Sequence, residues 1–468
     1  MIDNKSQSGF YLLSDNTDAF VARFALATIA KKTLDIQYYI IHRDASGQYL
    51  SYAILKAADR GVHVRILVDD INLSGRDSNL KMLSQHDNIE IRIFNPLRNR
   101  DWFRNIELVI NLNRVGRRMH NKAFIADNTV AIIGGRNIGD EYFDARQSLN
   151  FVDLDLLSVG PIVDDIGSSF DIYWNSHWAT PVENLSKTRV LKQQLFKFKQ
   201  KLKDKWHDAK NTRYFQSIQQ ADLTKKITSG QVPFIWASAK FFYDCPEKIS
   251  ADKPEKTYRI GPHVMPYFDE AKEKLLIATP YFVPGFSGSR WLTNKRQQGV
   301  DIQVLTNSLA ATDVIAVHAG YKKYRKPLVE DDIKLFELKP TARRFREKTK
   351  MILTGSSNSS LHAKYMVIDE RYVFVGSANI DPRSINLNTE IGIMVNSREL
   401  ARQTTELFEH TTSLDNCHQL LIDKSDNRLL WLTKENGKEV KHYKEPDASA
   451  LKKIGVFLLG LLPIESLL

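Results

Sequence analysis

The sequence predicts an α/β fold made of two duplicated domains, and two observations lead to this prediction. First, a His-x-Lys motif at His120 and Lys122 recurs at His362 and Lys364, 242 residues later. Second, short β-branched and aromatic runs alternate, within each half, with longer segments of helical periodicity. Alternating strands and helices form sheets covered by helices. Each half is therefore expected to be an α/β/α domain with a largely parallel or mixed sheet.

The same offset links other positions in the two halves, which supports an internal duplication. RGVHVRILVDD near the start of the first half recurs as QGVDIQVLTNS in the second, within four residues of the same offset. Three further pairs of residues are also 242 positions apart: Phe94 and Phe336, Asp127 and Asp369, and Asn137 and Asn379. One offset held over separate motifs indicates duplication. It predicts two similar domains related by pseudo-two-fold symmetry, with the active site at their interface.

Changes in composition divide the chain into four segments. Residues 1–180 and 258–425 are expected to be the two repeated domains. Residues 181–257 are rich in Lys and Gln and are predicted to form a basic helical connection. Residues 426–468 hold Asn436-Gly437, a strong signal for a two-residue β-hairpin turn, and end in an apolar tail.

Composition places the chain among globular proteins with an anionic partner. Its 468 residues suit two domains, and 43% hydrophobic with 26% charged residues argues against a mainly disordered chain. A formal net charge of +11 favours nucleic acid or an anionic membrane surface as the partner. Two cysteines, Cys245 and Cys417, are too few for a disulfide framework, which favours a reducing compartment.

The sequence shows neither a signal peptide nor a run of the ~20 apolar residues that spans a bilayer. The longest apolar run, from Ile454 to Ile464, follows Lys452 and Lys453 and is interrupted by Pro463. Two interpretations of this run remain open. It forms either a helix in the membrane interface, with its lysines at the head groups, or a helix docked on the protein core.

The paired motifs suit the chemistry of a phosphodiester. Residues two apart in a strand project from the same face, so His120 and Lys122 are expected side by side, as are His362 and Lys364. Two such halves facing a common crevice would supply lysines to neutralise the phosphate oxygens. One histidine would act as nucleophile and the other as general acid.

The acidic residues near the motifs are expected to have two different roles. Asp127 and Asp369 follow the motif histidines by seven residues, which is ~23 Å along a strand and on its opposite face. We therefore expect them to stabilise a local turn. A nucleophilic histidine needs an acceptor for its other ring nitrogen. The next strand of each half offers Asp153 and Glu390, with Asp155 in reserve.

Other reaction classes lack their signatures in this sequence. There is no HExxH, Cys cluster or EF-hand-like loop, so neither a metal nor another cofactor is expected. A Ser-His-Asp esterase is also disfavoured, because no GxSxG elbow occurs.

The repeated pattern HxKxxxxD, followed by a small-residue turn and an asparagine, resembles the signature of the phospholipase D superfamily. RRMHNKAFIADNTVAIIGGRNIGDEYF, DVIAVHAGYKKYRKPL and SANIDPRSINLNTEIG resemble the cardiolipin synthase branch in particular. The resemblance covers nearly the whole chain. It is strongest to the bacterial C-type enzymes, which lack the N-terminal transmembrane pair of the better-known type.

The resemblance implies a ping-pong phosphatidyl transfer from phosphatidylglycerol or phosphatidylethanolamine to phosphatidylglycerol. His120 would attack the donor and His362 would act as acid and base, while Lys122 and Lys364 would hold the phosphate. Asp153 and Glu390 match the carboxylates that orient the histidines. The positions expected to assist substrate binding are Asn137, Asn379, Ser377 and Gly135, the last of which is a serine in many members.

The resemblance also implies phospholipid substrates at an anionic membrane surface and a peripheral location on the cytoplasmic membrane, with no nucleic-acid partner. A small macrodomain protein is implied as a partner by the resemblance alone. Three other functions remain open: a hydrolytic phospholipase D, a nuclease-like phosphodiesterase, and a lipid-binding module without activity. The last is disfavoured because every motif residue is present in both halves.

Overall fold

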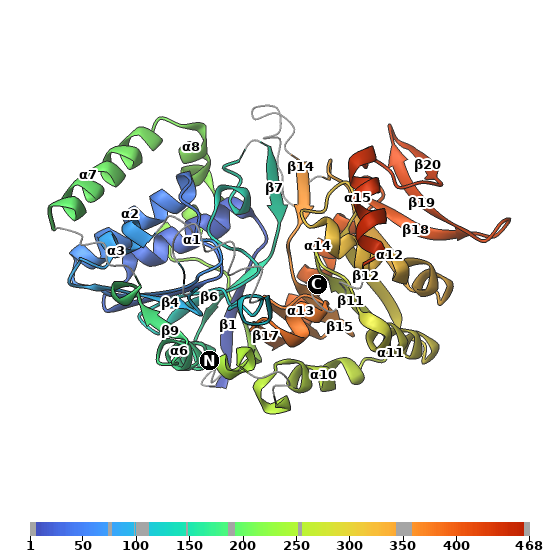
Figure 1. The fold of residues 1–468 in the computed structure, drawn as a ribbon, viewed down its shortest axis with the longest axis horizontal. Coiled ribbons are helices and arrows are strands. Elements are labelled where there is room, and N and C mark those ends of the chain that lie inside the picture. Colours follow the sequence, from blue (N-terminus) through green and yellow to red (C-terminus); the bar gives the residue numbers. More distant parts are fainter. Residues whose placement is uncertain are drawn as a thin grey trace. The chain divides into compact units, whose positions relative to one another are not determined.

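The computed structural model in Figure 1 describes residues 6–73, 77–97, 99, 112–146, 148–185, 192–250, 255–342 and 358–462. The chain forms two compact units, and each includes a short segment from the other half of the sequence. Unit 1 comprises Met1–Ala145, Asp155–Ile260 and Leu387–Ile393. Unit 2 comprises Arg146–Leu154, Gly261–Asn386 and Met394–Leu468. Both are mixed α/β structures, as the sequence predicts.

Unit 1 is built on a mixed sheet with a parallel centre. The parallel strands are β2 (Thr33–Tyr38), β3 (His63–Asp69) and β4 (Ile89–Phe94). Antiparallel strands continue the sheet beyond β2 in the order β5 (Ala123–Ala126), β6 (Val130–Gly134), β8 (Asp155–Val159), β1 (Ser8–Leu13) and β10 (Ile235–Tyr243). Beyond β4 lies β9 (Ala179–Pro181). Most residues of β1–β6 and β8 are buried, which accounts for their β-branched, apolar runs, whereas β10 at the edge is mostly half-buried or exposed.

The helices of unit 1 follow the strands in the alternating order that the sequence predicts. They are α1 (Asn16–Ile29), α2 (Ala45–Asp59), α3 (Asp77–Leu83), α5 (Leu112–Val115) and α6 (Ile162–Trp174). The carboxylates of Asp15 and Asp44 accept hydrogen bonds from backbone amides in the first turns of α1 and α2, and so begin these helices.

The segment predicted as a basic helical connection contains helices but does not stand apart from unit 1. Its helices are α7 (Lys192–Ala209), α8 (Arg213–Gln220) and α9 (Asp222–Thr228). Helix α7 packs on α2 and α3, and β10 adds a strand to the sheet of unit 1.

Unit 2 repeats the core of unit 1. Its parallel strands are β11 (Lys274–Ala278), β12 (Asp301–Asn307) and β13 (Lys334–Leu338), and β15 (Tyr365–Ile368) and β16 (Tyr372–Gly376) follow antiparallel beside β11. This is the order β4-β3-β2-β5-β6 of unit 1, so the predicted duplication is confirmed. Beyond β13 lie β18 (Cys417–Asp423), β19 (Arg428–Glu435) and β20 (Lys438–His442).

Helices and short strands complete unit 2. The helices are α10 (Gly261–Asp269), α11 (Gly285–Gln297), α12 (Ile315–Glu330), α13 (Pro382–Asn386), α14 (Arg398–Thr412) and α15 (Ala450–Gly460). Strand β7 (Leu149–Val152) pairs with β14 (Asn358–Leu361), and β17 (Ile391–Asn396), whose first three residues belong to unit 1, precedes α14. The predicted hairpin is present: β19 and β20 meet at Asn436 and Gly437, which have φ angles of 49° and 81°.

Candidate active site

Each motif histidine lies in an extended segment just before a strand. The sequence placed His120 and Lys122 inside a strand, but β5 begins at Ala123, and the second motif likewise precedes β15. The Met119 N–H donates to Asp69 Oδ2 at the end of β3, 2.9 Å away. At the equivalent place in unit 2, the Leu361 N–H donates to Asn307 Oδ1 at 2.7 Å.

Asp69 and Asn307 therefore hold the residue before each histidine. Sequence reasoning did not identify them as site residues. A sequence signal for them was present. The repeated segments RGVHVRILVDD and QGVDIQVLTNS each end in two polar residues, and Asp69 and Asn307 are the first residue of these two pairs.

Within unit 1, His120 is paired with Glu390. Met119 and Thr389 form a parallel bridge, and the His120 N–H donates to the Thr389 carbonyl at 2.9 Å. His120 follows Met119 and Glu390 follows Thr389, so this pairing sets His120 and Glu390 side by side. The distance between His120 Nδ1 and Glu390 Oε2 is 2.9 Å. Both side chains are buried.

Within unit 2, the same arrangement joins His362 to Asp153. Strands β7 and β14 are parallel, with Val152 opposite Leu361, and the His362 N–H donates to the Val152 carbonyl at 2.8 Å. His362 Nδ1 lies 2.7 Å from Asp153 Oδ2, and the carboxylate is fully buried.

This pairing corrects one interpretation of the sequence. We expected each carboxylate on the strand after the histidine of its own half to serve that histidine. Instead, Glu390 serves His120 and Asp153 serves His362, because a parallel in-register pairing links each motif to a segment from the other half of the sequence. The reserve candidate, Asp155, forms buried ion pairs with Arg23 and Arg136 instead.

The carboxylates define what the histidines can do chemically. A carboxylate at Nδ1 favours the tautomer in which Nδ1 carries the proton, which leaves the Nε2 lone pair for attack or proton transfer. It also stabilises the positive charge that the ring gains when Nε2 forms a bond or takes up a proton. Each unit therefore holds one oriented histidine, suited to nucleophilic or acid–base chemistry.

The motif lysines bring buried positive charge to the same places. Lys122 Nζ donates to the His120 carbonyl at 2.6 Å. Lys364 Nζ donates to the His362 carbonyl and lies 3.1 Å from His362 Nδ1. Both lysines are only 1% exposed. Burying an ammonium group costs desolvation energy, and a bound anion offsets that cost. Both lysines therefore suit the binding of a phosphate.

An aromatic ring packs on each histidine. The Tyr39 ring meets the His120 ring edge-on, with centroids 4.9 Å apart, and lies 5.5 Å from Lys122 Nζ. In unit 2, the Phe151 and His362 rings are 5.0 Å apart. These contacts restrict the rotation of each imidazole.

The other predicted substrate-binding positions lie at the ends of β6 and β16. Gly135 and Asn137 follow β6, and the Asn137 Nδ2 donates to the Tyr142 hydroxyl at 2.8 Å. Ser377 and Asn379 follow β16 and are buried, and the Asn379 N–H donates to Ser384 Oγ at 3.2 Å. Their contact with substrate stays a prediction.

Comparison with known proteins agrees with this geometry. The family model described as "Cardiolipin synthase, PLD-like domain" matches residues 25–174 and again 264–412. Cardiolipin synthase C of Escherichia coli K12 is 39% identical over 463 residues, covering 99% of this chain and 96% of that protein. The chain belongs to the phospholipase D-like cardiolipin synthase family.

Two further comparisons extend this similarity, one in sequence and one in fold. Cardiolipin synthase A of Pseudomonas entomophila is 24% identical, over 88% of this chain and 70% of that protein. The crystal structure of phosphatidylserine synthase from Haemophilus influenzae Rd KW20 superposes with a TM-score of 0.62 at 14% identity, covering 99% of this chain and 98% of that one.

The aspartates of the family motif do not touch the histidines. The Asp127 carboxylate accepts hydrogen bonds from the backbone N–H groups of Lys31, Lys32 and Thr33, at 2.7–3.1 Å. Asp369 accepts from Lys272, Glu273 and Lys274 in the same way. Both residues have positive φ angles, 54° and 50°, in two-residue turns. Each carboxylate therefore holds the distant segment that leads into β2 or β11, which corrects the prediction that it stabilises its own local turn.

These hydrogen bonds also affect ionisation. Burial raises the pKa of Asp127, but the amides of Thr33, Lys32 and Lys31 together outweigh that effect and hold the pKa below its usual value.

Replacing Asp127 with alanine is expected to destabilise unit 1 by about 2 kcal/mol, because several hydrogen bonds to one carboxylate are lost. Asp127→Asn keeps one oxygen acceptor and should lose less. Chemical denaturation would measure both changes, and the specific activity of the folded fraction should stay near that of the wild type. A large loss of kcat with unchanged stability would show that Asp127 takes part in catalysis.

Glu390 is itself held by a residue that sequence reasoning missed. The Asp244 carboxylate accepts the Glu390 N–H at 2.7 Å and pairs with Lys248 at 2.8 Å. The Asp244 N–H donates to the Glu390 carbonyl at 2.9 Å. Burial raises the pKa of Asp244 to about 6, although Lys248 opposes the shift. A single aspartate in a segment predicted as a helical connection carried no signal of this role.

In the part of the chain that the structure describes, no group of three or more His, Cys, Asp or Glu side chains is arranged to hold a metal ion. None of the helices in the same residues has the length and apolar character needed to cross a membrane.

Proposed function

We propose that this chain is a cardiolipin synthase, which transfers a phosphatidyl group from phosphatidylglycerol or phosphatidylethanolamine to phosphatidylglycerol. The observation that carries the proposal is the pair of equivalent half sites, each with a histidine oriented by a buried carboxylate and accompanied by a buried lysine. The 39% identity to cardiolipin synthase C over nearly the full length supports phospholipids as the substrate class.

In the first step of the proposed mechanism, His120 Nε2 attacks the phosphorus of the donor phospholipid. The bond from phosphorus to the head-group oxygen breaks, and that oxygen takes a proton from His362 and leaves as the free alcohol. Lys122 and Lys364 neutralise the charge on the non-bridging oxygens. Glu390 stabilises the positive ring of the phosphohistidine.

In the second step, a hydroxyl of phosphatidylglycerol attacks the phosphohistidine. It gives its proton to His362, now the base, and the bond between phosphorus and His120 breaks. The product is cardiolipin, and both histidines return to their starting protonation states. Water in place of the hydroxyl would give phosphatidic acid instead.

A lipid assay by mass spectrometry tests this proposal. Purified protein would be incubated with vesicles of phosphatidylglycerol, with and without phosphatidylethanolamine. We expect cardiolipin, and ethanolamine released together with it would identify phosphatidylethanolamine as a donor. Phosphatidic acid alone would make the protein a hydrolase. The absence of any lipid product would contradict the proposal and favour the nuclease activity, which cleavage of an oligonucleotide would then test.

We further propose that the protein acts as a peripheral membrane enzyme and that helix α15 contacts the bilayer. One face of α15 is docked in unit 2: Val456 packs with Leu309 and Ala319, and Lys452 Nζ donates to the Ala310 carbonyl at 2.8 Å. The other face exposes large apolar side chains, namely Leu451, Ile454, Phe457, Leu458, Leu461 and Leu462. Residues 463–468, the end of the predicted apolar tail, lie outside the described residues.

The docked interpretation of the apolar run holds for one face of α15, and our proposal assigns the membrane interpretation to the other face. The docked face fixes α15, and its exposed apolar face next to the exposed Lys453 suits the interface of an anionic bilayer. A macrodomain partner and the absence of a nucleic-acid partner stay predictions from the family resemblance.

Phe457→Asp is expected to weaken binding to phosphatidylglycerol vesicles about tenfold, since an exposed phenyl ring becomes a charge that the bilayer repels. Phe196→Asp is a matched control, because Phe196 is a similarly exposed phenylalanine on helix α7 (69% against 64% exposed). Vesicle co-sedimentation measures both. Equal losses in the two variants would contradict the role of α15.

A further inference from the structure

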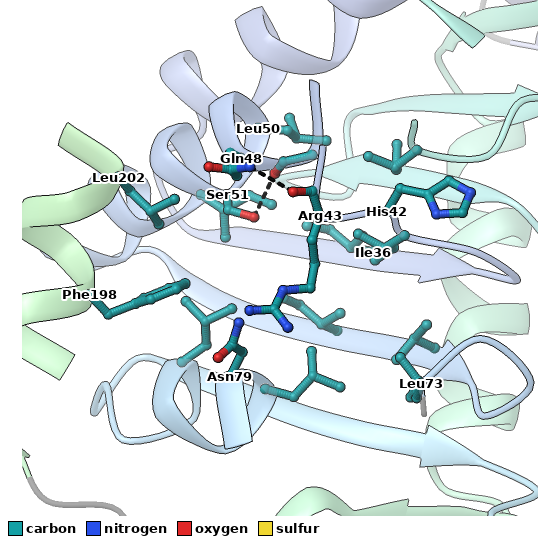
Figure 2. Close-up of a pocket in the computed structure, with 18 of the residues that line it drawn as sticks. Ile36, His42, Arg43, Gln48, Leu50, Ser51, Leu73, Asn79, Phe198 and Leu202 are labelled. Carbon is teal, nitrogen blue, oxygen red and sulfur yellow. Dashed lines mark hydrogen bonds between the residues drawn. The ribbon is translucent and has the colours of Figure 1, made fainter. Parts of the chain in front are cut away.

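A cavity of about 440 Å³ lies in unit 1 between the central strands and helices α2, α3 and α7. Figure 2 shows its aliphatic walls, with Phe198 and Leu202 of α7 on one side. Most of its surface is apolar; the strands contribute Ile36, Ile66 and Val68, and the helices contribute Leu50, Ile54 and Leu80. Its size falls within the range of pockets that bind small molecules and cofactors, about 300–1,000 Å³.

Three cationic residues line this cavity. Arg43, Lys201 and Lys205 are among its lining residues, and all three are exposed to solvent. Figure 2 shows the Arg43 guanidinium extending beside Asn79, whose amide oxygen accepts from Arg43 Nε at 3.0 Å once the amide is turned. Among the described residues, Arg43, Lys201 and Lys205 form no salt bridge, so they are available to an anionic ligand.

Two lining residues of the cavity are close in sequence to residues of the half site in unit 1. They are Ile41 and Ile138, which form a parallel β-bridge. Tyr39, which packs on His120, is two residues before Ile41, and Asn137 directly precedes Ile138. Two residues span at most ~7 Å. The apolar wall therefore begins well within the length of an acyl chain from the histidine.

We propose that this cavity binds one acyl chain of an anionic glycerophospholipid, with Arg43, Lys201 and Lys205 at its polar end. The inference rests on the proposed function and adds an acyl-chain subsite to it. A bilayer already shelters acyl chains, so apolar walls alone contribute little net affinity for a membrane lipid. The cationic rim supplies the selection for an anionic amphiphile.

Direct binding tests the subsite without reference to catalysis. Dioctanoyl-phosphatidylglycerol and octanoate, both used below the concentrations at which they aggregate, would each be titrated into the full-length protein by calorimetry. Ser51 lines the cavity from α2, and Ser51→Phe fills it. Excluding two methylenes is enough for about a tenfold loss of affinity, so we expect at least that for dioctanoyl-phosphatidylglycerol. If the protein binds octanoate but not dioctanoyl-phosphatidylglycerol, the ligand of the cavity is a free fatty acid, and the proposal is overturned.

The rim has a matched control on the same helix. Lys201→Glu with Lys205→Glu reverses two lining charges, whereas Lys197→Glu with Lys203→Glu makes the same change at exposed positions of α7 that do not line the cavity. We expect at least a tenfold weaker binding in the first pair and less than twofold in the second. Equal effects would show general charge attraction and contradict the subsite.

Failure of this inference and failure of the proposed function are distinguishable. If the wild type makes cardiolipin but Ser51→Phe and the rim variant bind dioctanoyl-phosphatidylglycerol as the wild type does, the subsite is wrong and the function stands. If binding depends on the cavity and its rim but no cardiolipin forms, the subsite stands and the function is wrong.

Discussion

His120→Ala is expected to reduce the kcat of cardiolipin formation at least about 10⁴-fold, because it removes the nucleophile of the first step. His362→Ala should cause a smaller loss, about 10²–10⁴-fold, because it removes the general acid. The measurement is the initial rate of cardiolipin formation in mixed vesicles. His63→Ala and His442→Ala are controls, since the exposed His63 pairs with Glu90 and the half-buried His442 pairs with Glu435, both outside the half sites.

Trapping the covalent intermediate separates the roles of the two histidines. Rapid acid-free quenching with donor labelled in its phosphate should place the label on His120 in the wild type and in His362→Ala. Label on His362 would reverse the assignment while leaving the two-histidine mechanism intact. The loss of label together with full turnover would contradict covalent catalysis altogether.

The second large effect is expected at the carboxylates. Glu390→Gln and Asp153→Asn keep the shape of each side chain but remove the charge that stabilises the partner imidazole when it becomes positive. Each should reduce kcat about 10²–10⁴-fold, with a smaller change in KM. Steady-state rates over a range of phosphatidylglycerol concentrations separate the two parameters.

The two variants should differ in the step that they slow. Glu390→Gln should reduce both the formation and the amount of trapped phosphohistidine at His120, whereas Asp153→Asn should slow proton transfer by His362. Near wild-type rates in either variant, with stability unchanged, would show that the carboxylate is not part of the catalytic machinery.

Much of the fold could be predicted from sequence because it is repeated and local. Buried strands with β-branched runs and the hairpin at Asn436-Gly437 depend on short-range chemistry. The Asp127 and Asp369 carboxylates instead bind backbone N–H groups of Lys32 and Glu273, 95 and 96 residues away. The fixed offset then identified equivalent residues in both halves, including both histidines and both lysines.

The partners of the histidines could not be predicted in the same way. Glu390 is 270 residues from His120, and Asp153 is 209 residues from His362. The sequence identifies the carboxylates as candidates, but a repeat is equally consistent with pairing within one half or across halves. Only the parallel pairing of β7 with β14, and of Thr389 with Met119, decides between them. Asp244 and α15's docked face likewise depend on contacts between distant segments.

Nuclear magnetic resonance of ¹⁵N-labelled histidine side chains tests the crossed pairing of histidines and carboxylates most directly. The Nδ1 resonance of His120 should move in Glu390→Gln and stay in place in Asp153→Asn, while the Nδ1 resonance of His362 should do the opposite. If Asp153→Asn moves His120 and Glu390→Gln moves His362, each histidine is served by its own half of the sequence, and the arrangement described above is contradicted.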